Sequence, residues 1–282
     1  MIDFPEIIDF PLADGIDAAM DWLLEHLDGF FDAVGFIILQ VVNFFEGIFL
    51  FVPWFVLIPL VGLAGWKLIG KWKTGIVFML LLMLIGSFGY WDLAMRTLAL
   101  VIASVFFSLL IGIPTGISMA RNDRTQAILQ PILDGMQTMP SFVYLIPALM
   151  FFGMGKVPAM FATIIYAVPP VIRLTNVGIR TVDPEAVEAS KAFGATPRQV
   201  LFDVQLPLAK PSIMVGINQT TMMALAMVVM GSMIGAKGLG MEVLVAISRI
   251  EVGQGFEAGL SIVILAIIID RITHSFSEKK DK

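Results

Sequence analysis

The chain has 282 residues, of which 58% are hydrophobic and only 15% are charged, and its net charge is −5. A soluble domain carries about 25% charged residues, so this composition excludes a water-soluble protein and favours a lipid bilayer as the solvent. The absence of cysteine excludes disulfides, thiolate metal sites and thiol nucleophiles, and the two histidines, near opposite ends of the chain, do not form a zinc motif.

The N-terminal part is acidic, with ten acidic residues and no lysine or arginine among the first 66. Residues 1–10 lack the basic region of a cleavable signal peptide, so we do not expect one. Residues 14–34 predict an amphipathic helix, because apolar and acidic side chains repeat at three- and four-residue spacing on separate faces. Helices that bind anionic lipid usually carry lysine and arginine, so three placements are open: on another protein, on the opposite leaflet, or against its own chain.

Residues 35–51 are apolar but contain Gln40, Asn43 and Glu46, and they fit either a membrane span or a second interfacial segment. Clear spans follow along the rest of the chain. They are predicted over residues 53–66, 74–90, 98–120, 140–155, 157–172, 211–236 and 252–272. The uncharged segment 98–120, at about 34 Å as a helix, is long enough to cross the hydrocarbon core.

Seven spans distribute the lysines and arginines unevenly. Fourteen of the 18 fall on one side, and only Arg96, Lys156, Lys237 and Arg249 fall on the other. The richer side is therefore predicted to be cytoplasmic, with the C-terminus inside and the acidic N-terminus outside. An eighth span at residues 35–51 would place the acidic N-terminus in the cytoplasm, which the distribution of basic residues disfavours. The interfacial interpretation of that segment is therefore favoured. The sequence thus predicts an all-α, polytopic membrane protein with about seven transmembrane helices and an N-terminal amphipathic helix.

The longest predicted cytoplasmic loop, residues 173–210, has the pattern of two short helices. Asp183-Pro184-Glu185 is typical of a helix start, because aspartate caps, proline fits the first turn and glutamate suits the positive end. Good helix formers follow up to Phe193, and Gly194 supplies the left-handed conformation that ends helices. Thr196-Pro197 then starts a second short helix. The loop is predicted to be a helix–glycine–helix elbow that projects between two spans.

This elbow resembles the EAA loop of ABC importer permeases, in which E-A-A is followed after three residues by G and after nine more by I-x-L-P. Five positions agree within a 20-residue window, while Ser190 and Val204 replace an alanine and an isoleucine. The alternative, an ordinary loop helix with a glycine cap, accounts less well for so many fixed positions. The resemblance implies a helix that docks on an ATPase subunit. The coupling residues are then Glu185, Glu188, Ala189, Ser190, Gly194, Val204, Leu206 and Pro207.

Residues 134–145, 216–219 and 234–240 resemble segments of glycine betaine/proline-type permeases. This likeness implies a transport subunit in a prokaryotic cytoplasmic membrane that imports a small osmoprotectant by alternating access. Permeases for choline, carnitine or proline share much of it and are the alternatives. The implied partners are two ATPase subunits, a second permease copy forming a homodimer, an extracytoplasmic substrate-binding protein, membrane lipid and the small-molecule solute, but no nucleic acid.

The resemblance also implies a division of the chain. Residues 1–52 form an acidic interfacial segment and residues 53–90 form scaffold helices. The five-helix core of a type I ABC importer extends over residues 91–275 and includes the coupling loop, and residues 276–282 form a cytoplasmic tail.

Several other functions are disfavoured by what the chain lacks. Four of the spans contain no Asp, Glu, Lys, Arg or His, whereas a proton-coupled carrier keeps ionisable groups at mid-membrane. No Walker A pattern occurs, so ATP and Mg²⁺ are expected on the partner ATPase, and no cofactor or metal is expected in this chain. We do not expect an enzyme, because no paired nucleophile and base is visible. An osmotically gated channel stays open as an alternative, although it would need no ATPase dock.

A candidate translocation pathway rests on weaker signals. Aromatic faces hold quaternary ammonium groups by cation–π attraction, yet aromatic and methionine side chains in spans more often serve packing. Polar amides at mid-span more often form interhelical hydrogen bonds than solute sites. The candidate residues are Met139, Phe142, Tyr144, Tyr166, Asn218, Gln219 and Met222.

Overall fold

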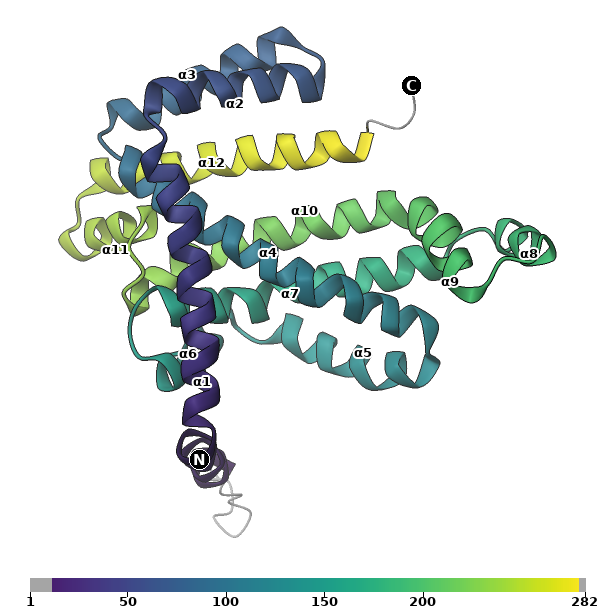
Figure 1. The fold of residues 1–282 in the computed structure, drawn as a ribbon. Helices are drawn as coiled ribbons and strands as arrows, with labels where there is room; N and C mark the ends of the chain where they lie inside the picture. Colours follow the sequence, from purple (N-terminus) through teal and green to yellow (C-terminus); the bar gives the residue numbers. More distant parts are fainter. Residues whose placement is uncertain (1–11, 279–282) are drawn as a thin grey trace, which may run out of the picture.

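The computed structural model describes residues 12–278, and over this range it contains helices and no strands (Figure 1). Four long helices form the body of the molecule and lie side by side. They are α4 (Trp91–Arg121), α7 (Lys156–Arg180), α10 (Leu206–Gly231) and α12 (Val252–Glu278). Each contains an apolar stretch long enough to cross a bilayer, so the predicted all-α membrane fold is confirmed.

Small residues allow the long helices to pack closely. A Cβ added at Gly116 of α4 would lie 2.6 Å from the Cβ of Thr175 on α7. A Cβ at Gly178 of α7 would lie 2.8 Å from the Cβ of Ser212 on α10. Because the lipid gives little hydrophobic drive for association, close backbone approach of this kind is what holds membrane helices together.

The predicted span 140–155 is shorter than expected, because its helical part comprises only η2 (Ser141–Tyr144) and α6 (Leu145–Phe152). Helix α5 (Asp123–Thr138) precedes it and is bent by 110° from the segment Ser141–Phe152. Met139 precedes a proline and is extended, with ψ at 136°, which ends α5. Helix α5, which was assigned to a loop, returns along α4 and α7 and buries Leu133 against them.

The N-terminal helix α1 (Leu12–Phe51) joins the predicted amphipathic helix to residues 35–51, with a kink at Leu27. It runs across the beginnings of α4 and α7 rather than alongside them (Figure 1). At the crossing, the buried Glu46 pairs with both Arg96 and Lys156, and Lys156 also donates to Asn43. These pairs explain how an acidic residue is tolerated within an apolar segment.

The predicted spans 53–66 and 74–90 form a helical hairpin of α2 (Trp54–Ile69) and α3 (Trp72–Ser87), which packs on α12. Each has 16 residues, or about 24 Å, which is shorter than the hydrocarbon core. By length and composition alone, the described residues contain five helices able to cross a membrane, or six if the bent pair of α5 and α6 counts as one. Helix α1 is among the five, although it lies crosswise to the others.

The remaining helices lie at the two ends of the body. Helix α11 (Leu239–Arg249) precedes α12 at the end that carries Arg96 and Lys156. Helices α8 (Pro184–Ala192) and α9 (Pro197–Gln199) lie at the opposite end, between α7 and α10. Of the predicted tail 276–282, the last four residues lie outside the described range, as do residues 1–10 that bear on a signal peptide.

Candidate functional site

The elbow between α7 and α10 has the local structure that its sequence predicts. The side chain of Asp183 accepts a hydrogen bond from the backbone N–H of Glu185 at 2.9 Å, and Pro184 occupies the first position of α8. Gly194 has a φ of +84°, the left-handed conformation that favours glycine. Its N–H donates to the carbonyl of Lys191 at 2.9 Å, which closes the helix.

The second arm of the elbow begins with a capping box. The N–H of Thr196 donates to Oε1 of Gln199 at 2.8 Å, and the Gln199 N–H donates back to Oγ1 of Thr196 at 3.4 Å. These reciprocal bonds satisfy donors at a helix start. The helix then passes through a π-helical segment, Val200–Gln205, and continues directly into α10. The non-helical link is therefore much shorter than the predicted loop 173–210.

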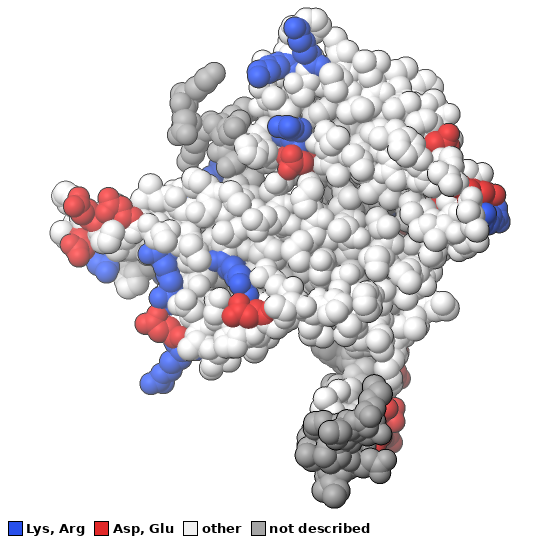
Figure 2. Space-filling model, turned by 180° about the vertical axis from the view of Figure 1, so that it is seen from behind, with Lys and Arg blue, Asp and Glu red and all other residues white. Residues whose placement is uncertain are grey.

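The outward surface of the elbow is available for a partner. Helix α8 has no buried residue, and Glu185, Glu188 and Ala189 are exposed. Phe193 is 93% exposed, more than any other large apolar side chain among the described residues. Figure 2 shows acidic and basic side chains gathered at the end of the molecule that carries α8.

The inner side of the elbow packs on the body through a small apolar cluster. Its buried members are Ile179 of α7, Val182, Leu201 of the π-helical segment and Ala209 of α10. Val187 of α8 and Leu206 pack against them, together with Ile117 and Ala120 of α4. This cluster, which we call the elbow core, connects α8 to the ends of the three long helices. A movement of α8 would therefore be passed to those helices by direct contact.

A hollow of 400 Å³ lies beside the elbow core. It is lined by residues of α4, α7 and both arms of the elbow, including Arg121 and Lys191. An adjoining hollow of 330 Å³ is lined in part by Glu188. The elbow is thus packed against the long helices through the elbow core, and two hollows lie beside this contact.

The sequence did not predict the polar contacts that join α7 to α5 near the elbow. Arg180 pairs with Asp123 of α5 at 2.7 Å and donates to Oδ1 of Asn176 at 3.1 Å. Arg173 pairs with Asp134, which joins α7 to α5. The only signal in the sequence is the four-residue spacing of Asn176 and Arg180 on one helix, because the other contacts join segments far apart in the chain.

The predicted coupling residues divide into two groups. Glu185, Glu188, Ala189, Gly194 and Pro207 are exposed, whereas Ser190, Val204 and Leu206 are half-buried. Of the half-buried residues, Leu206 packs against the elbow core.

The seven predicted pathway residues are only partly brought together. The rings of Tyr144 and Tyr166 lie 6.1 Å apart, and the Tyr144 hydroxyl donates to the carbonyl of Met136. Met139 and Phe142 are exposed beside them at the bend after α5. On α10, Gln219 is exposed and Met222 is half-buried.

Asn218 belongs to a different contact from the tyrosine pair. Its side-chain N–H donates to Oδ1 of Asp270 on α12 at 2.9 Å. This is the interhelical hydrogen bond that the sequence favoured over a solute site.

The chain is similar to several known proteins. Residues 112–280 match the family described as binding-protein-dependent transport system inner membrane component. The chain is 48% identical over 278 residues to the glycine betaine/carnitine transport permease protein GbuB of Listeria monocytogenes serotype 1/2a (strain 10403S), covering 98% of each chain. It is 45% identical over 272 residues to the glycine betaine transport system permease protein OpuAB of Bacillus subtilis (strain 168), covering 96% of this chain and 95% of the relative.

A third relative is the glycine betaine/proline betaine transport system permease protein ProW of Escherichia coli (strain K12). The two are 46% identical over 265 residues, which is 94% of this chain and 75% of the relative. Among solved structures, the MetNI methionine ABC transporter in an inward-facing conformation matches with a TM-score of 0.58 and 24% identity. That match covers 64% of this chain and 91% of the MetNI chain, and it supports the fold.

Proposed function

The chain belongs to the family of binding-protein-dependent transport system inner membrane components, and from this premise we propose that it is the permease subunit of an ATP-driven importer of glycine betaine. The observation that carries the proposal is the identity of 45–48%, over nearly the whole chain, with permeases named for glycine betaine. The exposed elbow agrees with it, since a channel would have no use for a surface that docks an ATPase.

The elbow is the proposed contact with the ATPase. Glu185, Glu188 and Ala189 face outward on α8 and would enter a groove of the partner, with Phe193 as the apolar anchor. Leu206 packs against the elbow core, and the half-buried Val204 lies in the adjoining π-helical segment. ATP and Mg²⁺ are bound by the partner, and this chain carries out no chemistry of its own.

The pathway is proposed to lie between two copies of the chain. Helix α5 exposes Asp134, Gln137 and Thr138. Polar side chains are costly against lipid tails, so this face is better placed against water in a pathway than against the bilayer. Met139 and Phe142 continue the same exposed surface. Two copies, with one elbow each, would also supply the two docks that a pair of ATPases needs.

The chain is proposed to be oriented with α8 in the cytoplasm and the N-terminus outside, following the distribution of basic residues. Residues 91–275 would then form the importer core and residues 53–90 a scaffold beside it. Residues 1–52 would lie on the outer surface, where an external binding protein delivers its solute.

The proposal is tested by purifying the chain with its candidate ATPase and measuring uptake in vesicles with the binding protein present outside. We expect ATP-dependent uptake of glycine betaine, and faster hydrolysis when the loaded binding protein is added, because the pathway state and the ATPase state are linked. Carnitine is the second solute to test, since the relative GbuB is named for it. A chain that conducts solute stably without any ATPase would favour the channel instead.

The elbow contact is tested by cross-linking, and because the chain has no native cysteine each cross-link reports one introduced position. Glu188→Cys should form a disulfide with a cysteine in the ATPase groove. Arg124→Cys, on the exposed start of α5, is the matched control and should not. Cross-linking of position 124 but not of position 188 would place the ATPase elsewhere.

A further inference from the structure

The α2–α3 hairpin carries an apolar groove of 450 Å³ on its surface. Gly62 and Gly75 are among its lining residues, because the two backbones meet there with no side chains between them. Leu63 and Ile76 contribute further apolar surface, and both are exposed. The groove is thus open, and it suits a hydrocarbon chain better than any polar ligand.

One end of this groove is marked by two tryptophans. Trp66, near the end of α2, and Trp72, at the start of α3, both line it and are 51% and 59% exposed. Tryptophan in membrane proteins gathers at the level of the lipid headgroups. The groove therefore extends from the headgroup level into the hydrocarbon core.

Three lysines lie at the same level. Lys67, Lys71 and Lys73 are all exposed, and within residues 12–278 none of them is paired with a carboxylate. Figure 2 shows the basic side chains at this turn with no acidic side chain beside them on the visible face. Lys71 precedes α3 without capping it by a side chain, so the first N–H groups of α3 add to the positive potential.

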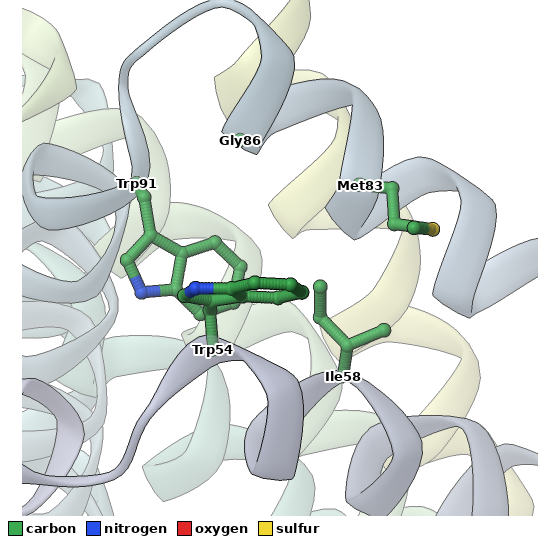
Figure 3. A pocket seen from close by; sticks show the side chains of 5 residues that line it. All are labelled: Trp54, Ile58, Met83, Gly86 and Trp91. Atoms are coloured by element: carbon green, nitrogen blue, oxygen red, sulfur yellow. The ribbon is translucent and has the colours of Figure 1, made fainter.

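The opposite end of the hairpin provides an internal comparison. A hollow of 310 Å³ lies there, lined by Trp54, Ile58, Met83, Gly86 and Trp91. Figure 3 shows the indoles of Trp54 and Trp91 on one side of the view and Met83 on the other. It has a tryptophan pair at headgroup level but no basic residue in its lining. Of the two ends of the hairpin, only the Trp66–Trp72 end therefore combines an apolar groove with nearby lysine side chains.

We propose that this groove is a binding site for an anionic phospholipid. One acyl chain lies in the groove over Gly62 and Gly75, and the phosphate-bearing headgroup contacts Lys67, Lys71 and Lys73. Each lysine near a membrane surface favours an anionic lipid by roughly fivefold in association constant. The inference goes beyond the proposed function, because it concerns the hairpin and not the pathway or the elbow.

The test uses tryptophan fluorescence of the full chain in bilayers of a zwitterionic lipid. One background keeps Trp66 and Trp72 and replaces the other three tryptophans by phenylalanine; a second background keeps only Trp54 and Trp91. Phosphatidylglycerol or phosphatidylcholine with brominated acyl chains is titrated in, since bromine quenches indoles that it touches. We expect the anionic lipid to quench the first background at a lower mole fraction than the neutral lipid, by roughly fivefold for each of the three lysines. Both lipids should quench the second background equally.

Matched variants separate the site from general effects of charge. Lys67→Gln with Lys73→Gln should lower the preference for the anionic lipid by roughly fivefold per lysine, whereas Arg124→Gln with Lys210→Gln, which removes the same charge elsewhere, should leave it unchanged. Ile76→Phe, which fills the groove, should reduce quenching, and Val77→Phe, outside the lining, should not. Equal quenching by both lipids in the first background, or equal losses in the lysine pair and its control, would overturn the proposal.

Discussion

The guanidinium of Arg180, at the end of α7, donates a hydrogen bond of 2.8 Å to the backbone carbonyl of Met119 near the end of α4. The same side chain pairs with Asp123 at the start of α5. Three helix ends are therefore tied together directly beside the elbow core. Arg180 therefore joins the ends of α4, α5 and α7 by polar contacts, next to the place where apolar contacts join α8 to α4 and α7.

Arg180→Met should weaken the coupling between ATP hydrolysis and uptake. The substitution keeps an unbranched apolar stem but removes the bonds to Met119, Asn176 and Asp123. Hydrogen bonds to charged groups contribute about 1.5–3 kcal/mol, and partial exposure places this loss at the lower end. We expect reduced solute uptake per ATP hydrolysed. The exposed Arg124→Met serves as the control, and a similar loss in both variants would remove the special role of Arg180.

Gly194→Val should uncouple transport while leaving the spans inserted. A Cβ at Gly194 would meet no atom within 4 Å, so the effect comes from the backbone, whose φ of +84° costs a β-branched residue about 1–2 kcal/mol or more. Asparagine tolerates this conformation better, so Gly194→Asn should retain most of the uptake. Measurement of uptake and ATPase rates for both variants distinguishes conformation from side-chain contact. Normal uptake by the valine variant would show that the elbow does not need this turn.

The orientation predicts which positions react with a membrane-impermeant thiol reagent. In intact cells, a cysteine at position 17 should be labelled from outside. A cysteine in place of Ser190 should be labelled only after the membrane is permeabilised. Because the chain has no native cysteine, each signal reports one site. Labelling of position 190 in intact cells would reverse the orientation.

Gly75→Leu should open the α2–α3 hairpin. A Cβ at Gly75 would lie 2.5 Å from the carbonyl oxygen of Gly62, and backbone at such a distance cannot yield without moving a helix. Gly86→Leu on the same helix meets nothing within 4 Å and is the matched control. We expect a lower thermal unfolding temperature for the first variant and a much smaller change for the second. Equal unfolding temperatures would mean that the hairpin is looser than its contacts indicate.

The elbow could be predicted from the sequence because its determinants are local. Asp183, Pro184 and Gly194 act on neighbouring backbone groups, so a short window holds all that is needed. The bend between α5 and α6 was missed because periodicity reports apolar faces and does not report where one helix turns away from the next. The ion pairs of Glu46 could not be predicted, because Arg96 and Lys156 lie 50 and 110 positions away from it in the chain.

Glu46 provides the last prediction, because its carboxylate lies between two cations at the junction of α1, α4 and α7. Glu46→Gln removes the only negative charge of the group formed with Arg96 and Lys156, so its net charge rises from +1 to +2. The buried position makes this repulsion costly, although the two cations are about one-third exposed and water reduces the effect. We expect a lower unfolding temperature and faster proteolysis within α1.

Adding Lys156→Met to Glu46→Gln returns the net charge of the group to +1. If charge repulsion is the cause, the double variant should be more stable than Glu46→Gln alone, even though it has lost one more polar contact. If the lost hydrogen bonds are the cause, it should be no more stable. A double-mutant cycle on the unfolding free energy measures the difference, and a coupling near zero would show that Glu46 and Lys156 do not hold α1 on the body.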